Sequence, residues 1–249
     1  MSLDELPTVR GVPSVTAKQM AEVDRVTIEE IAISVDALME NAAHQIARAA
    51  RALVGRVDGK RIVGLVGRGN NGGDAAGALR HLAGWGAEVR AEVAAFPDDV
   101  RETTARQLIS LLQIGPSVVR YANPEAPRGP SPNADLVIDG LLGYSARGAP
   151  RDPIADLIRA ANSSATPILA VDIPSGLDPD TGTGTDVAIH AKATVTLALP
   201  KTGLLATGAR GAVGELLLAD IGIPHLAFAR VGIDTRRLFV DGDLVRIRH

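Results

Sequence analysis

With 249 residues, 46% of them hydrophobic, the chain is long enough to bury a sizeable core, and we expect a single domain over residues 1–249. The net charge is only −3, the 26 Lys and Arg residues are scattered, and 2% of the residues are aromatic, which argues against a nucleic-acid partner, because such a protein needs a basic surface and rings for base stacking. No cysteine is present, which excludes disulfides, thiolate catalysis and cysteine-ligated metals.

The N-terminal segment gives no sign of export. Residues 1–11, MSLDELPTVRG, contain acids and a proline and lack an apolar stretch. No later run reaches the roughly 18 apolar residues of a membrane span. We therefore expect a cytoplasmic protein with no membrane partner.

Two helices are predicted before the first strand: a Ser/Thr cap at residues 14–16 precedes a helical pattern through Met20, and residues 37–53 carry a second apolar stripe. From Arg61 onward, short apolar runs alternate with helical stretches of about a dozen residues, as in βαβ units whose parallel sheet is covered on both faces. A Gly-rich segment replaces the last long helix, so a less regular sheet edge is expected. Strands are predicted over 62–66, 87–95, 117–121, 135–139, 167–171, 193–199 and 214–219, helices over 74–85, 100–112 and 154–161, and a Pro-rich surface loop over 123–133.

A glycine-rich turn follows the first predicted strand. Residues 67–72, GRGNNG, match G-x-G-x-x-G in the strand-to-helix context where this motif binds phosphate. Its glycines permit a close approach of the backbone, and the helix N-terminus offers free N–H groups. The alternative is an ordinary turn in which Asn71 and Asp74 only cap the helix. The density of polar residues over 70–74 favours binding, whereas the late arrival of acids at 98–99 argues against an ordinary NAD-dependent dehydrogenase.

Two aspartates end predicted strands, Asp139 after LVI and Asp172 after ILAV. Ligands of open parallel sheets bind beyond the carboxyl ends of the strands, so both acids are expected in one crevice with the glycine-rich turn; the alternative is that each caps a turn. Asp139, Asn71 and Ser175 would supply hard oxygen ligands, which suit a monovalent cation better than Mg²⁺. No zinc site is predicted from the spacing of the histidines, which are His44, His81, His190, His225 and His249.

The segments described so far resemble the NAD(P)H-hydrate epimerase family, also called the YjeF N-terminal domain. The resemblance runs from about Val15 to Pro224 and is carried above all by GNNGGD at 69–74 and VDIPSGLD at 171–178. It implies a Rossmann-like three-layer α/β/α sandwich with a mostly parallel central sheet and two N-terminal helices. It also implies an isomerase that interconverts the R and S forms of NADHX and NADPHX, which are NADH and NADPH hydrated at C6 of the nicotinamide ring. The other shared segments are 16–20 with Asp24, 38–42, 139–143, 180–182, 193–196, 200–201 and 221–224.

The same resemblance implies a set of site residues. The catalytic acid corresponds to Asp172, and the ligands of one K⁺ per subunit correspond to Asn71, Asp139 and Ser175. It further implies a homodimer, and a separate dehydratase that completes the repair, because no fused dehydratase domain is expected in this chain. The substrate-binding residues correspond to Asn70, Asn71, Gly72, Gly73, Asp74, Gly143, Tyr144, Ser145, Ala146, Arg147, Gly148, Ala149 and Asp172.

This sequence departs from the family pattern at a few positions. Ala43 and Ala75 stand where glycine is common, and Tyr144-Ser145 replaces Thr-Gly in the second substrate loop, where Tyr144 is expected to alter the pocket wall. Lys201 is interpreted as a surface residue. A non-catalytic nucleotide- or protein-binding scaffold of the same fold is the main alternative function. A phosphate transferase is less well supported, because only Arg68 offers a positive charge within the turn.

Overall fold

The computed structural model of the chain describes residues 2–115, 118–121 and 133–248. The strands in this part are β1 Thr8–Val9, β2 Arg61–Val66, β3 Glu88–Val93, β4 Val119–Tyr121, β5 Leu136–Gly140, β6 Ile168–Val171, β7 Ala193–Leu197, β8 Glu215–Ala219 and β9 Leu244–Ile247. They form one sheet in the order β1-β9-β8-β7-β6-β5-β2-β3-β4. Neighbours are parallel except β8 and β9, which are antiparallel. The predicted mostly parallel sheet is confirmed.

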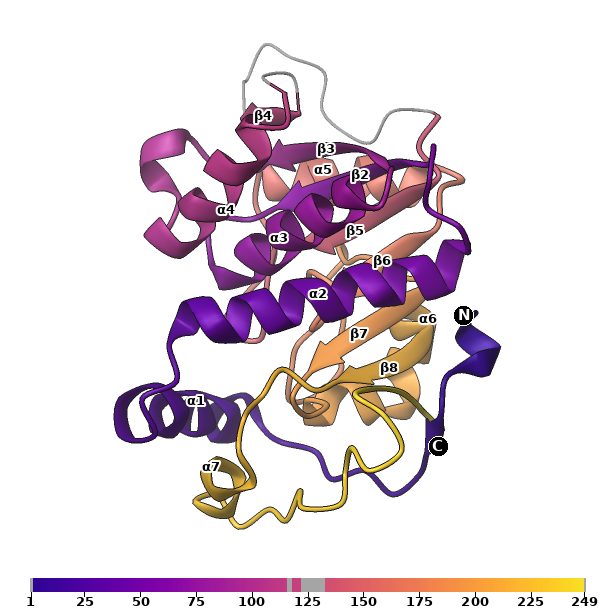
Figure 1. The fold of residues 1–249 in the computed structure, drawn as a ribbon. Helices are drawn as coiled ribbons and strands as arrows, with labels where there is room; N and C mark the ends of the chain where they lie inside the picture. The colour runs from indigo at the N-terminus through magenta and orange to yellow at the C-terminus, as the bar shows by residue number, and fades with distance from the viewer. Residues whose placement is uncertain (1, 116–117, 122–132, 249) are drawn as a thin grey trace.

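Helices cover both faces of this sheet. Figure 1 shows α2 and α3 crossing in front of the strands, with α5 and α6 behind them. This arrangement is the expected three-layer α/β/α sandwich. The helices are α1 Ala17–Arg25, α2 Val35–Val54, α3 Asn70–Gly84, α4 Glu102–Leu112, α5 Ile154–Ser163, α6 Arg210–Val213 and α7 His225–Ala229; a π-helical turn spans Val26–Glu30, and 3-10 turns span Leu3–Glu5, Pro97–Asp99, Thr202–Leu205 and Thr207–Ala209.

The central strands are apolar on both faces because each face carries a helix layer. In β2, Ile62 and Val66 pack into the core beneath α2 and α3, whereas Val63 and Leu65 pack into the core beneath α5. Side chains of a strand alternate between faces, so a strand buried on both sides has a continuous apolar sequence. The short apolar runs in the sequence were therefore enough to locate these strands.

Most predicted elements are confirmed, with differences at the ends. The two N-terminal helices are α1 and α2, and the side chain of Thr16 caps α1 by accepting a hydrogen bond from the Gln19 amide at 3.2 Å. The predicted start of the next helix at Asp74 is wrong, because α3 begins at Asn70. β1, β9 and α7 were not predicted, since two to five residues are too few to show a periodicity. The predicted loop over 123–133 lies outside the described residues except for Asn133.

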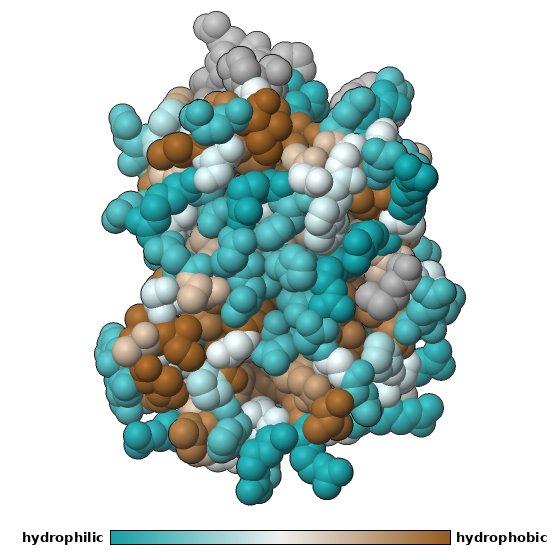
Figure 2. Space-filling view, viewed as in Figure 1, coloured by the Kyte–Doolittle hydropathy of each residue, from teal (hydrophilic) through white to brown (hydrophobic). Residues whose placement is uncertain are grey.

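The N-terminal helices divide between core and surface. Met39 is buried against α3, where a Cβ atom on Gly73 would lie 2.6 Å from its Cε atom, whereas Ala37 is exposed. Figure 2 shows a mostly hydrophilic middle, with apolar side chains gathered at the lower left over α1 and α7. Ile28, directly after α1, and Leu226, in α7, are large apolar residues that remain exposed. In the part of the chain that the structure describes, no helix has both the length and the apolar character needed to cross a membrane.

Candidate functional site

The glycine-rich turn connects β2 to α3 and packs closely against its own backbone. A Cβ atom on Gly72 would lie 2.0 Å from the carbonyl oxygen of Gly67, and one on Gly67 would lie 1.9 Å from the carbonyl oxygen of Leu141. Both positions therefore need glycine for internal packing. Gly69 differs, because nothing lies within 4 Å of where its Cβ atom would be. At Gly67 and Gly72 the close approach expected from the sequence is therefore made by the protein's own backbone. At Gly69 the backbone has open space in which a ligand could approach.

The first turn of α3 is anchored to α4. The Thr104 hydroxyl donates to the Gly69 carbonyl oxygen at 2.9 Å, and the Thr103 hydroxyl donates to Oδ1 of Asn70 at 3.2 Å. These contacts fix the turn at the carboxyl edge of the sheet. Of the residues predicted to bind substrate here, Asn70 is exposed, Asn71 is half-buried, and Gly72, Gly73 and Asp74 are buried.

Asn71, Asp139 and Ser175 are brought together, as the strand-end argument predicted. Ser175 donates to Asp139 through its hydroxyl at 2.7 Å and its amide at 2.9 Å, and the Leu141 amide donates to the same carboxylate at 3.2 Å. The Leu142 amide donates to the Ser175 hydroxyl, and the amide nitrogen of Asn71 donates to the Leu142 carbonyl oxygen, both at 3.0 Å. Leu141 and Leu142 therefore link the three side chains.

The chemistry of this oxygen group fits a monovalent cation. Asp139 is fully buried, and burial raises the pKa of its carboxyl to about 6, against the lowering effect of the hydrogen bonds from Ser175 and Leu141. Among the described residues, no cationic side chain acts on this carboxyl, which is held by hydrogen bonds from Ser175 and Leu141 alone. The nitrogen of the Asn71 amide faces Leu142, which leaves its oxygen as the available ligand. One carboxylate, one amide oxygen and one hydroxyl suit K⁺ better than a divalent ion.

Asp172 follows β6 in a left-handed backbone conformation, with φ of 64°. Its Oδ1 atom accepts hydrogen bonds from Lys201 Nζ at 2.5 Å and from the Leu197 amide at 3.2 Å. The Lys201 ammonium also donates to the Leu197 carbonyl oxygen at 3.1 Å, and the residue as a whole is only 1% exposed. The interpretation of Lys201 as a surface residue is therefore wrong. Its position after β7 turns the side chain inward, where the carboxylate of Asp172 compensates its charge.

Two further carboxyl groups surround the ion pair of Asp172 and Lys201. Burial raises the pKa of Asp74 well above its usual range, and the charges of Asp172 and Asp24 act in the same direction while Lys201 opposes them. Burial also raises the pKa of Asp24, against a lowering hydrogen bond from Tyr144. Three acids thus share one buried lysine. We call Asp24, Asp74, Asp172 and Lys201 the acid cluster.

Tyr144 connects the second predicted substrate loop to the acid cluster. Its hydroxyl donates to Asp24 Oδ2 at 2.5 Å, and its ring centre lies 5.5 Å from Lys201 Nζ. Burial and the charge of Asp24 raise the pKa of the phenol, so it remains a donor. Tyr144 therefore belongs to the wall of the acid cluster, and its expected effect on the wall of the substrate pocket stays a prediction.

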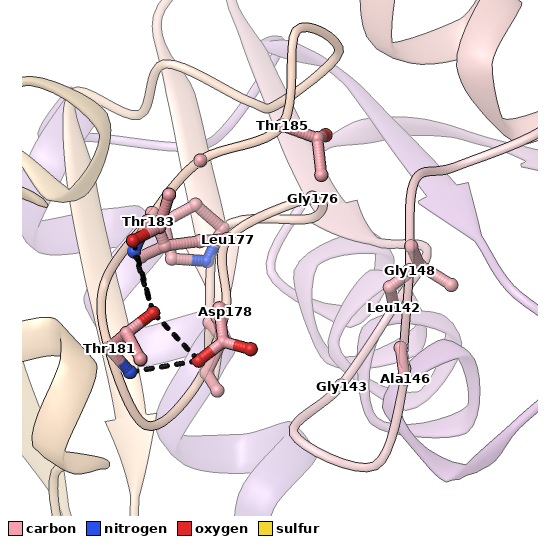
Figure 3. A pocket seen from close by; sticks show the side chains of 13 residues that line it. Leu142, Gly143, Ala146, Gly148, Gly176, Leu177, Asp178, Thr181, Thr183 and Thr185 are labelled. Carbon is pink, nitrogen blue, oxygen red and sulfur yellow. Dashed lines mark hydrogen bonds between the residues drawn. The ribbon is translucent and has the colours of Figure 1, made fainter.

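A cavity of about 250 Å³ opens between the loop after β5 and the loop after β6. Figure 3 shows Gly143, Ala146 and Gly148 on one side, facing Leu177, Asp178 and Thr183 on the other. Within the loop after β6, Asp178 accepts hydrogen bonds from the amide and hydroxyl of Thr181, at 2.8 and 3.0 Å. Of the other residues in the predicted segment 143–149, Ser145 and Ala149 are exposed, and Arg147 donates to the Tyr144 and Ala146 carbonyl oxygens.

Asp24 and Lys201 are the members of the acid cluster that residue-by-residue reasoning did not assign to the site. Both occur in segments that carry the family resemblance, which was the available signal. The structure also places His44 beside His81, with ring centres 5.2 Å apart on α2 and α3. Among the described residues, no group of three or more His, Cys, Asp or Glu side chains is arranged to hold a metal.

The fold is that of a Rossmann-like α/β protein, with a mostly parallel sheet between two helix layers. Its glycine turn and buried acids lie together at the carboxyl edge of the sheet. Residues 35–203 match the model of the family described as YjeF-related protein N-terminus. The chain belongs to this family.

Several known proteins are similar to this chain over most of its length. An NAD(P)H-hydrate epimerase of Dehalogenimonas lykanthroporepellens is 38% identical over 96% of this chain and 94% of that protein. A bifunctional NAD(P)H-hydrate repair enzyme of Hyperthermus butylicus is 39% identical over 88% of this chain but only 40% of its own length. The crystal structure of yeast ynu0 has a TM-score of 0.79, covering 94% of this chain and 100% of the yeast chain at 21% identity, which is a likeness of fold.

Proposed function

We propose that the protein is an NAD(P)H-hydrate epimerase, an isomerase that interconverts the R and S forms of NADHX and NADPHX. The observation that carries the proposal is the acid cluster at the carboxyl edge of the sheet, in a chain that matches a protein of that name over 94% of that protein's length. Epimerisation at C6 passes through a positive centre, and buried carboxylates stabilise such a centre.

The chemistry needs few groups from the protein. The ring nitrogen of the substrate shares its lone pair with C6 as the hydroxyl leaves, which gives a planar iminium ion. Water then returns to either face of C6. The carboxylate of Asp172, held by Lys201 at 2.5 Å, is the proposed catalytic group that stabilises this cation, because a fixed negative charge beside a developing positive one lowers the barrier.

Substrate binding is assigned to the rim around the acid cluster. The open backbone at Gly69 leads into the first turn of α3, whose N-terminus favours phosphate. The cavity between the two loops offers room for another part of the dinucleotide. The proposed substrate-binding residues are Asn70, Asn71, Gly72, Gly73, Asp74, Gly143, Tyr144, Ser145, Ala146, Arg147, Gly148, Ala149 and Asp172.

The test of function uses a mixture of the two hydrate epimers away from equilibrium. We expect the protein to speed the approach to equilibrium of NADHX or NADPHX well beyond the rate in buffer, as followed by chromatography of the epimers. Heat-denatured protein is the control. A folded protein that binds the hydrates yet leaves the rate unchanged would favour the alternative, a non-catalytic scaffold.

We further propose that Asn71, Asp139 and Ser175 hold one K⁺ per subunit. The ion supplies the positive charge that compensates the carboxylate of Asp139. In the folded protein the pKa of the Asp139 carboxyl is raised to about 6. The folded state therefore loses stability as the pH rises from the ordinary aspartate pKa through about 6, and the free energy of unfolding falls by about 3 kcal/mol over this range. We expect KCl to restore stability above pH 6 more than choline chloride does, as a rise in melting temperature. Asp139→Asn should remove this salt-specific rise. Equal melting curves in both salts at pH 8 would contradict the cation site.

The proposed assembly and setting follow from the same family expectation. We place a homodimer contact at the N-terminal helices, and the exposed apolar side chains of Ile28 and Leu226 beside α1 and α7 support this face (Figure 2). The setting is cytoplasmic. A separate dehydratase that consumes one epimer is the proposed partner in the pathway, and the relatives named as bifunctional repair enzymes support a coupling of two activities.

A further inference from the structure

The two innermost carboxyl groups of the acid cluster have contrasting surroundings. Asp172 accepts hydrogen bonds from Lys201, the Leu197 amide and the Thr196 hydroxyl, the last at 3.4 Å. Asp74 is only 9% exposed, and no group in the described residues donates a hydrogen bond to its carboxyl. Within the described part of the chain, one carboxyl is thus held on several sides, whereas no hydrogen bond from a described residue ends on the carboxyl of Asp74.

Asp74 nevertheless lies within reach of charge. Its carboxyl is acted on by Asp172, Asp24 and Lys201, and Tyr144 closes the far side of Asp24. The four ionisable side chains come from α3, the end of β6, α1 and the end of β7. A carboxyl that has lost most of its solvent and that no neighbouring donor holds is disfavoured in its charged form. An arrangement of this kind is retained where the group binds or reacts with a ligand.

The two carboxyl groups differ in the charges that they face. The ammonium of Lys201 lies in direct contact with Asp172 Oδ1, at 2.5 Å. Burial and two neighbouring acids raise the pKa of Asp74, so this carboxyl keeps its proton to higher pH than an ordinary aspartate. Neighbouring carboxyls whose environments differ in this way commonly divide the roles of acid and fixed charge.

We propose that Asp74 transfers the proton to and from the C6 hydroxyl, whereas Asp172, fixed by Lys201, serves as a permanent negative charge. This inference rests on the epimerase function proposed above and assigns its proton transfer to a different residue from its charge stabilisation.

In the proposed step, one proton and the electron pairs at C6 move. The carboxyl proton of Asp74 moves to the C6 hydroxyl oxygen as the C6–O bond breaks, and that bond's electron pair leaves with the oxygen as water. The lone pair of the ring nitrogen forms the N=C6 bond of the iminium ion. On return, a water oxygen forms the new C6–O bond on either face and gives one proton back to the Asp74 carboxylate. No oxidant or reductant is consumed.

Asp74→Asn tests the assignment, because asparagine keeps the shape and removes the transferable proton. We expect kcat for epimerisation to fall about 100-fold, in the range typical of a lost general acid, while the hydrate mixture still raises the melting temperature of the variant. Wild-type kcat should decrease with rising pH as Asp74 loses its proton, and the variant should lack this dependence. Stability should change in the opposite sense: the raised pKa means that wild type loses stability as the pH rises, so the variant melts at an equal or higher temperature at pH 8.

The matched control is Asp172→Asn, which should also slow the reaction but should still show a decrease of kcat with rising pH, displaced to lower pH because the charge of Asp172 no longer raises the pKa of Asp74. A folded Asp74→Asn variant with kcat within about threefold of wild type would overturn the assignment. If that variant does not fold, the wild-type profile decides: a decrease of kcat above the normal carboxyl range supports it, and a constant kcat from pH 5 to pH 9 overturns it. A wild-type protein that never accelerates epimerisation contradicts the proposed function itself.

Discussion

Replacing Lys201 by Met is expected to lower the free energy of unfolding by about 3–5 kcal/mol, as measured by urea denaturation. Lys201 is only 1% exposed, and its ammonium contacts Asp172 Oδ1 at 2.5 Å. Its removal leaves the Asp172 carboxylate buried beside Asp74 and Asp24 with no positive charge, and breaking one side of a buried ion pair typically costs this much.

The reverse change should cost less. In Asp172→Asn, Lys201 keeps the Leu197 carbonyl oxygen at 3.1 Å and its attraction to Asp24. The double variant Lys201→Met with Asp172→Asn should recover most of the stability lost in Lys201→Met, since no uncompensated charge remains on either residue.

The control for Lys201 is a lysine in a solvent-exposed ion pair. Lys60 contacts Asp135 at 3.0 Å, but its side chain is 39% exposed, and exposed pairs contribute at most about 1 kcal/mol. Lys60→Met should therefore melt close to wild type. Equal losses for Lys60→Met and Lys201→Met would show that the contact between Lys201 and Asp172 contributes no more than a surface pair.

The sequence located the strand-end residues correctly because parallel topology constrains where strands end. Short apolar runs ending in Asp139 and Asp172 could only be buried strands, and their carboxyl ends share one edge of the sheet. Asn71 and Ser175 were named with Asp139 as possible oxygen ligands, and in the structure hydrogen bonds through Leu142 link these side chains. The sequence therefore predicted where these residues lie along the carboxyl edge of the sheet.

The direction of individual side chains did not follow from the sequence. Lys201 begins a segment after β7 that pairs with Val15 in an isolated bridge, and this long-range contact turns the lysine inward. Asp180, in the segment shared with the family, accepts a hydrogen bond from the Ala17 amide at 2.6 Å at the start of α1. Both contacts join residues more than 150 positions apart, so no local pattern reports them.

The glycines of the turn show a second limit of prediction from sequence. A motif match explains every glycine by phosphate binding, although the positions need glycine for different reasons. At Gly67 and Gly72, backbone oxygens lie 1.9 and 2.0 Å from where a Cβ atom would be, whereas a Cβ atom on Gly69 would meet nothing within 4 Å. The G-x-G-x-x-G pattern gives no means of separating the two cases. Only the middle glycine has the open environment that a phosphate needs.

Alanine at Gly72 and at Gly69 should therefore have opposite consequences. Gly72→Ala pushes a methyl group into the Gly67 carbonyl, and the backbone must move because no flexible side chain can give way; we expect a loss of about 3 kcal/mol or more in unfolding free energy. Gly69 has φ of −97° and open space, so Gly69→Ala should change stability by less than about 1 kcal/mol.

The kinetics should distinguish the same two variants, because Gly69→Ala is expected to affect substrate binding and not stability. A methyl group on Gly69 stands where the dinucleotide is proposed to approach, so Gly69→Ala should raise KM for the hydrates while its melting temperature stays close to wild type. Denaturant curves and epimerisation kinetics on the two variants check both halves. If Gly72→Ala were as stable as wild type, internal packing would not be what requires glycine there. If Gly69→Ala kept the wild-type KM, the open backbone at the turn would not be the place where substrate binds.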